Sequence, residues 1–294
     1  MIVGTRGSKL ALAQTSIFIN ALKKKFPDVS VDIKRIVTSG DKIRDRPLSA
    51  LGGYGAFVKE LDREILDGNI DVAVNSLKDM PVKLTEGTCL AAVLPRGPVE
   101  DVIIPPLPLE KLPPGSVVGT SSIRRKALLM SKRGDLVIKD LRGNVTTRLR
   151  KLESREYDAI VMARVGLERI GFGGHFLPLD PEEFIPAVGQ GAIAVVCKKG
   201  SEYEEMLKSI EDPVTRMEVD VERFILGALG GGCSVPIGLW AKVDGNHMRV
   251  RGVVLTEFGK RLAKVDRTFA IETIPQALDS IVSELRKGME SDRR

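Results

Sequence analysis

Cys233 is the residue whose surroundings most clearly suggest chemistry. Residues 229–236 read Leu-Gly-Gly-Gly-Cys-Ser-Val-Pro, so three glycines precede the thiol and Pro236 follows it closely. Glycines allow another molecule to come close to the backbone, and a proline prevents a helix from continuing through the segment. The pattern predicts that a ligand approaches Cys233.

The other two cysteines lie in apolar surroundings. Cys89 occurs in TCLAAVLP and Cys197 in AIAVVCKK, which are runs typical of strands, so we expect both to be buried packing residues. Three widely spaced cysteines do not indicate a disulfide framework. The chain also has only two histidines and no Cys-x-x-Cys pair, so no metal site is expected.

Basic residues are concentrated between Ser121 and Arg155. This segment holds eleven Lys and Arg against three Asp and Glu, a net charge of +8, whereas the whole chain carries +6. Such an excess favours an anionic ligand or a nucleic acid. Aromatic residues are 4% of the chain and none lies in this segment, which argues against a base-stacking surface. No GxxxxGK[ST] phosphate loop is present.

Four turns combine a strand end, a helix start and basic residues: TRGSKLALAQ (5–14), GTSSIRRK (119–126), LRGNVTTRLRKL (141–152) and ARVGLERIG (163–171). Free N–H groups at a helix N-terminus bind anions, and arginine can grip a carboxylate with two hydrogen bonds. The alternative for each turn is an ordinary helix cap with arginines in solvent. Together the turns predict a pocket for a ligand with several carboxylates.

The stretch NSLKDMP (75–81) places Lys78 and Asp79 directly after an apolar run at 70–74. An aspartate beside a lysine can stay ionised and stabilise a developing positive charge, or it can move a proton. The alternative is a surface turn with a local ion pair. The glycine-rich LGGYGAFVKEL (51–61) could form a lid or simply begin a helix.

Apolar runs typical of strands alternate with runs that have apolar residues at helical spacing. Five prolines between residues 104 and 115 indicate a linker or an irregular edge. The pattern predicts an α/β fold with mainly parallel sheets, followed by an α+β tail. Strands are expected at 1–4, 31–37, 70–74, 90–94, 116–119, 136–139, 159–163, 192–197, 237–243, 248–255 and 261–269, and helices at 8–26, 56–66, 122–131, 144–153, 165–170, 218–229 and 274–287.

Two linkers, near 95–115 and 180–188, suggest that a middle domain is inserted into the first. We expect domain 1 to contain residues 1–94 and 187–212, domain 2 residues 95–186, and a smaller α+β domain 3, with Cys233, residues 213–294. In open α/β sheets ligands bind at the carboxyl ends of the strands. No apolar run is long enough to span a membrane, and the N-terminus lacks a signal peptide's apolar core, so we expect a cytoplasmic protein.

These motifs together resemble the hydroxymethylbilane synthase (porphobilinogen deaminase) family. The matching strings are TRGSKLALAQ, GGYGAFVKELD, DVAVNSLKDMP, VGTSSIRRK, LRGNVTTRL, YDAIVMARVGLERIG, PAVGQGAIAV and LGGGCSVPIG, in the family's order from residue 4 to about residue 238. The resemblance implies two periplasmic-binding-protein-like α/β domains around a cleft, plus the smaller C-terminal α+β domain.

The resemblance also implies a chemistry. Members carry a dipyrromethane cofactor attached by a thioether to the cysteine that corresponds to Cys233. They add four porphobilinogen units to it, release ammonia each time, and hydrolyse off linear hydroxymethylbilane, a tetrapyrrole precursor. A small-molecule substrate, a monomeric enzyme, and neither a nucleic-acid nor a membrane partner are implied.

Roles carry over residue by residue. Asp79 corresponds to the catalytic aspartate, which would stabilise the cationic azafulvene formed on deamination. Arg148 is assigned to carboxylates of the cofactor and of the incoming substrate. The other expected cofactor ligands are Lys78, Ser121, Ser122, Arg124 and Arg125, and the other expected substrate ligands are Arg6, Ser8, Phe57, Arg142 and Arg169.

The chain departs from many relatives at three positions: Ala50 and Tyr54 replace lysines of the glycine-rich loop, and Asn75 replaces a histidine. These changes put a charge-based role of that loop in doubt. Two other functions remain open, a non-catalytic binding module for an anionic solute and, behind it, a nucleic-acid binder. The glycine loop of Cys233 and the N-terminal sequence argue against the binding module.

Overall fold

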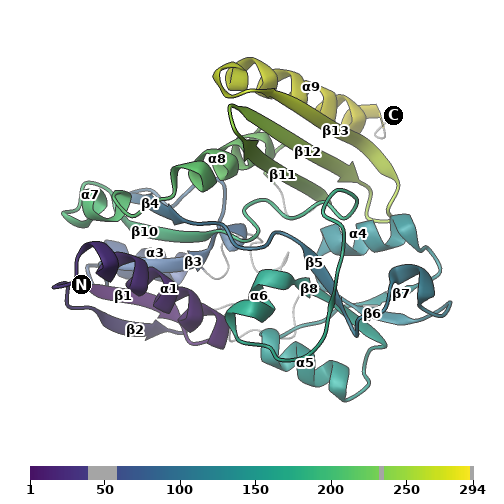
Figure 1. Cartoon of the computed structure of the whole chain (residues 1–294), viewed down its shortest axis with the longest axis horizontal. Helices are drawn as coiled ribbons and strands as arrows, with labels where there is room; N and C mark the ends of the chain where they lie inside the picture. The colour runs from purple at the N-terminus through teal and green to yellow at the C-terminus, as the bar shows by residue number, and fades with distance from the viewer. Residues whose placement is uncertain (39–57, 232–234, 292–294) are drawn as a thin grey trace. The chain divides into compact units, whose positions relative to one another are not determined.

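The computed structural model describes residues 1–38, 58–231 and 235–291 (Figure 1), and the chain forms two compact units. Unit 1 contains residues 1–97 and 189–220, and unit 2 contains residues 98–188 and 221–294. The three-domain division and the cleft expected from the sequence stay predictions.

Unit 1 is built on a five-stranded sheet with the order β2-β1-β3-β10-β4. The first three strands are parallel, but β10 runs antiparallel to both of its neighbours. Four of the five strands therefore run in the same direction, and only β10, which starts at the edge where β3 ends, departs from the parallel arrangement that the sequence predicted. The strands are β1 (Ile2–Arg6), β2 (Asp32–Ile36), β3 (Val72–Ser76), β4 (Thr88–Leu94) and β10 (Ile193–Lys198).

Helices cover both faces of this sheet, which is why its inner strands β3 and β10 and the edge strand β4 are largely apolar, whereas the edge strand β2 (DIKRI) is exposed. On one face Phe18 and Leu22 pack against Val3, and on the other Leu61 and Ile65 pack around Ala73. The helices of unit 1 include α1 (Lys9–Lys25), α3 (Lys59–Leu66) and α7 (Tyr203–Lys208), and a 3-10 turn, η2 (Leu77–Asp79), follows β3.

Cys89 and Cys197 lie opposite each other on β4 and β10, in strands as expected, with their sulfur atoms 3.6 Å apart. Cys197 is buried, but Cys89 is only half-buried. Burial, with the neighbouring Cys197 thiol and the Glu204 carboxylate, raises the pKa of Cys89 to about 12. Cys89 is therefore a neutral packing thiol at neutral pH.

Unit 2 contains a second five-stranded sheet, with the order β7-β6-β8-β5-β9. Again three strands are parallel, and β5 runs antiparallel to β8 and β9. The strands are β5 (Asp101–Ile104), β6 (Val117–Gly119), β7 (Val137–Lys139), β8 (Ala159–Ala163) and β9 (Leu177–Pro178); the helices beside them are η3 (Leu109–Lys111), α4 (Ile123–Lys132), α5 (Val145–Glu153) and α6 (Arg164–Arg169).

The rest of unit 2 is an antiparallel three-stranded sheet with α9 along it, drawn in olive and yellow in Figure 1. Leu278, Ile281 and Leu285 form the buried side of α9. In the described part of the chain, every helix is too short or too polar to cross a membrane. Helix α8 (Pro213–Ala228) belongs to unit 1 up to Asp220 and to unit 2 from Val221. The other elements are β11 (Ile237–Asp244), β12 (His247–Leu255), β13 (Arg261–Ala270), η4 (Ile271–Thr273) and α9 (Ile274–Ser291).

Candidate functional site

Unit 1 brings four of the expected site residues to one edge of its sheet. Strands β1 and β3 are parallel neighbours, so their carboxyl ends lie together. Arg6 is the last residue of β1, and η2 carries Lys78 and Asp79 directly after β3. Ser8 caps α1, because its hydroxyl accepts a hydrogen bond from the Ala11 N–H at 3.2 Å. All four side chains are half-buried, which leaves them accessible to a ligand.

Hydrogen bonds from neighbouring segments fix this edge. The Leu77 N–H donates to the Ala192 carbonyl at 3.1 Å, which ties η2 to the start of β10. The Lys78 ammonium donates to the Gln190 side-chain oxygen at 3.3 Å, and the Gln14 amide donates to the Ser76 hydroxyl at 2.8 Å. Both glutamines are buried. Sequence reasoning did not assign them, although each stands in a motif quoted for the family, as a polar residue among small and apolar ones.

Unit 2 also places its expected residues where parallel strands end and helices begin. Ser122 caps α4 by accepting from the Arg125 N–H at 3.4 Å, and the Ser121 hydroxyl donates to the Leu141 carbonyl at 2.9 Å. After β7, Asn144 caps α5 through the Thr147 N–H at 2.9 Å. Arg148 and Arg142 lie half-buried at this helix start, and the Arg148 guanidinium donates to the Gly143 carbonyl at 2.8 Å.

Arg124 and Arg125 are buried, and both bind the carboxylate of Asp101, which is fully buried at the start of β5. Asp101 accepts at 2.7 Å from Arg124 and at 2.7 and 3.1 Å from Arg125. Two guanidinium groups face one carboxylate, so the cluster keeps a positive charge. The assignment of both arginines to cofactor carboxylates stays a prediction, and Asp101 is a partner that sequence reasoning missed.

Arg169 is the last residue of α6. Burial lowers its pKa to about 10, and the Glu168 carboxylate opposes this effect. The guanidinium is still protonated at neutral pH. A partly desolvated cation is stabilised when an anion binds beside it, so the position suits a ligand carboxylate.

Cys233 and Phe57, as well as Ala50 and Tyr54, lie outside the described residues. The glycines that precede the cysteine are partly described, and two of them lie just after the end of α8. Gly230 and Gly231 have φ angles of 92° and 56°, and their N–H groups donate to the carbonyls of Gly227 and Leu226, which is a Schellman motif. A Cβ at Gly230 would meet nothing within 4 Å. There the left-handed backbone, rather than lack of space, requires glycine.

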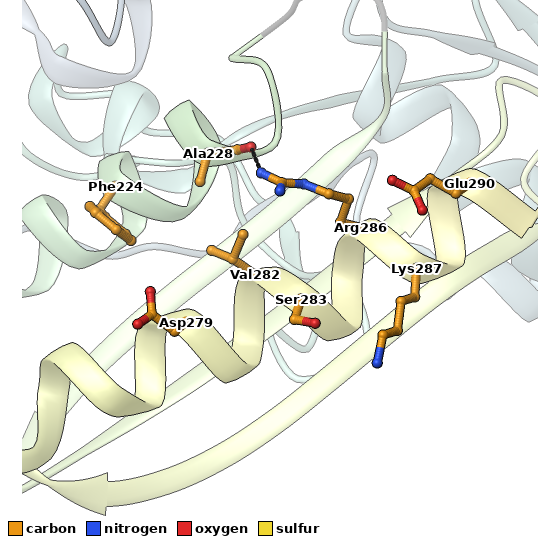
Figure 2. A pocket seen from close by; sticks show the side chains of 8 residues that line it. All are labelled: Phe224, Ala228, Asp279, Val282, Ser283, Arg286, Lys287 and Glu290. Carbon is orange, nitrogen blue, oxygen red and sulfur yellow. Dashed lines mark hydrogen bonds between the residues drawn. The ribbon is translucent and has the colours of Figure 1, made fainter.

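A groove of about 450 Å³ lies beside the end of α8 in unit 2 (Figure 2). It contains none of the residues expected to bind cofactor or substrate. Among the described residues, no three His, Cys, Asp or Glu side chains gather closely enough to hold a metal ion. The lining residues are Phe224, Ala228, Asp279, Val282, Ser283, Arg286, Lys287 and Glu290.

The molecule is thus a mixed α/β protein whose strand ends present arginines, hydroxyls, a lysine and an aspartate. Residues 1–206 match the porphobilinogen deaminase, dipyromethane cofactor binding domain, and residues 216–283 match the porphobilinogen deaminase C-terminal domain. The chain belongs to the porphobilinogen deaminase family. The family suggested by the sequence motifs is thereby confirmed. Cys233 falls in the C-terminal match, whereas the other expected site residues fall in the first.

Relatives support this over nearly the whole chain. It is 45% identical to the porphobilinogen deaminase of Geobacillus kaustophilus (strain HTA426), over 97% of this chain and 94% of that protein. It is 40% identical to that of Halalkalibacterium halodurans (strain ATCC BAA-125 / DSM 18197 / FERM 7344 / JCM 9153 / C-125), over 99% of each. Among solved structures, a periplasmic substrate-binding protein of an ABC transporter from Coxiella burnetii aligns with 74% of this chain and 94% of its own, at 14% identity and a TM-score of 0.43.

Proposed function

We propose that this chain is a hydroxymethylbilane synthase. It condenses four porphobilinogen molecules onto a dipyrromethane attached to Cys233, releases ammonia at each addition, and then releases linear hydroxymethylbilane by hydrolysis. The observation that carries the proposal is the edge of the unit 1 sheet, where Asp79 lies with Lys78, Arg6 and Ser8 in a chain of this family. We place the enzyme in the cytoplasm as a monomer that acts on a small molecule.

The donor set fits a dipyrromethane. Each ring of that group bears an acetate and a propionate, and buried carboxylates are costly unless cations or hydrogen-bond donors pair with them. When bound, the group would supply the pyrrole carbon to which the first unit is joined, and each later unit would join the ring added before it. Lys78, Ser121, Ser122, Arg124, Arg125 and Arg148 would hold its carboxylates, and Cys233 would provide the sulfur of the thioether.

The other groups act on porphobilinogen. Arg6, Ser8, Arg142 and Arg169 bind its acetate and propionate and so orient the ring, with Phe57 assigned to the same task. As the amine leaves, positive charge develops on the substrate pyrrole, and the Asp79 carboxylate stabilises it and holds the pyrrole N–H. The Lys78 ammonium, which donates a hydrogen bond to Gln190, would bind a carboxylate of the cofactor beside Asp79.

Intact mass combined with a porphobilinogen consumption assay tests this function. We expect the purified wild-type chain to be heavier than its sequence by one dipyrromethane and to consume porphobilinogen. Cys233→Ser should be unmodified and inactive, whereas the control Cys89→Ser should keep the adduct, because Cys89 is a packing thiol of unit 1. An adduct on Cys233→Ser would refute the assignment of the thiol. An unmodified and inactive wild-type chain that binds small polycarboxylates would favour the solute-binding module.

A further inference from the structure

A side chain of α9 holds the end of the helix that leads to Cys233. The Arg286 guanidinium donates a hydrogen bond to the Ala228 carbonyl at 2.6 Å, the dashed line in Figure 2. Ala228 is the last residue of α8, and Cys233 lies five residues later. A cation at a helix C-terminus also interacts favourably with the helix dipole.

Arg286 completes the hydrogen bonding of the helix end. The last four carbonyls of an α-helix have no partner within the helix. Here three of them accept from the next main-chain N–H groups: Ile225 from Leu229 at 3.0 Å, Leu226 from Gly231 at 2.8 Å, and Gly227 from Gly230 at 3.0 Å. The fourth, Ala228, accepts from Arg286.

The far side of the cysteine loop is fixed as well. The Pro236 carbonyl accepts from the Leu255 N–H at 3.0 Å, and β11 then begins at Ile237, paired with Val254 of β12. The Glu222 carboxylate of α8 accepts from the Ala241 N–H of β11 at 2.9 Å. The chain on both sides of Cys233 is therefore attached to the same small sheet.

Helix α9, which carries Arg286, is packed closely against the small sheet. Leu285, next to Arg286, is fully buried. A Cβ at Gly288 would lie 2.5 Å from the Leu262 carbonyl oxygen and 2.7 Å from the Ala263 Cβ, so α9 can lie this close to β13 only with glycine there. The Arg286 side chain thus extends from a backbone held in place against the sheet.

We propose that Arg286 is a positioning residue for Cys233. By binding the Ala228 carbonyl it holds the end of α8, from which the chain continues to Cys233. A change in α9 would in this way affect attachment of the cofactor. This inference rests on the proposed function, which makes Cys233 the attachment point.

The first test measures the helix end without any cofactor. Amide hydrogen exchange of residues 229–231 is compared in Cys233→Ser protein with and without Arg286→Ala. Loss of one hydrogen bond should speed exchange about five- to tenfold, while exchange in β12 stays unchanged. Arg286→Lys should restore part of the protection. Lys287→Ala, which changes the next residue and the same groove, is the matched control and should behave like its parent.

The second test measures cofactor attachment by intact mass, with Cys233 present. Arg286→Ala should show a smaller fraction of adduct-bearing chains than wild type or Lys287→Ala. Full adduct in Arg286→Ala overturns the proposal, whether exchange is unchanged or faster, because Arg286 would then be at most a helix cap. Absence of adduct from the wild type itself would overturn the proposed function instead, and with it the link to attachment.

Discussion

The two five-stranded sheets have the same plan, and their differences lie at the strand ends. In each, a middle parallel strand, β1 or β6, precedes a serine that caps a helix, Ser8 or Ser122. The segment after the third parallel strand differs between the units. In unit 1 this strand leads into the short turn with Lys78 and Asp79, whereas in unit 2 it leads into α6 and Arg169.

The acids of the two regions also differ. Asp79 is half-buried and can reach a ligand, whereas Asp101 is fully buried beneath two arginines. An accessible carboxylate can take part in proton transfer, and a carboxylate enclosed by guanidinium groups mainly stabilises the fold. Under the proposed function, Asp79 would be the reacting acid, whereas Asp101 would serve only to hold Arg124 and Arg125.

The largest effect should come from removing the acid of unit 1. Asp79→Asn should lower turnover about 10²- to 10⁴-fold, the usual contribution of a positioned acid or base, while intact mass still shows the adduct. The control Asp67→Asn changes an exposed acid paired with Arg63 and should leave turnover near wild type. Near-normal bilane production by Asp79→Asn would remove the distinction between the two units.

The local part of this comparison could be predicted from the sequence. The β8 strand matches its predicted range residue for residue, and α5 begins one residue after its predicted start. Such elements can be recognised in the sequence because the spacing of apolar residues and the capping residues are signals that span only a few positions. The placement of Arg6 and Asp79 at one edge was also predictable, since parallel neighbours end together.

The features that the sequence did not reveal depend on residues far apart in the chain. Strand β5 falls inside the stretch interpreted as a linker, because prolines come directly after it and its partner β8 lies more than fifty residues later. Arginines in the first turn of α4 resemble solvated residues until Asp101 of β5 is placed beside them. The direction of β10 likewise depends on where the returning chain enters the sheet.

Smaller effects are expected from two substitutions in unit 2, one of the buried Asp101 and one of Arg142, which is assigned to substrate. Asp101→Asn leaves two buried guanidinium groups without their anion, which should cost about 3–5 kcal/mol of stability and lower Tm by about 10 °C. Arg142→Ala removes a half-buried cation, so Tm should change little while kcat/KM falls about 10- to 100-fold. Thermal unfolding and steady-state kinetics measure both. A Tm loss in Arg142→Ala as large as in Asp101→Asn would contradict the separation.

The smallest effects are expected from the helix N-caps Ser8 in unit 1 and Asn144 in unit 2. Asn144 accepts from the Thr147 N–H at 2.9 Å and from the hydroxyls of Thr146 and Thr147, whereas Ser8 accepts from one N–H at 3.2 Å. Asn144→Ala should therefore cost about 1–2 kcal/mol and Ser8→Ala about 0.5–1 kcal/mol in urea unfolding. Because Ser8 is assigned to substrate, its replacement should also raise KM. An unchanged KM in Ser8→Ala would reduce that serine to a helix cap, as Asn144 is, and would leave the unit 1 edge to Arg6, Lys78 and Asp79.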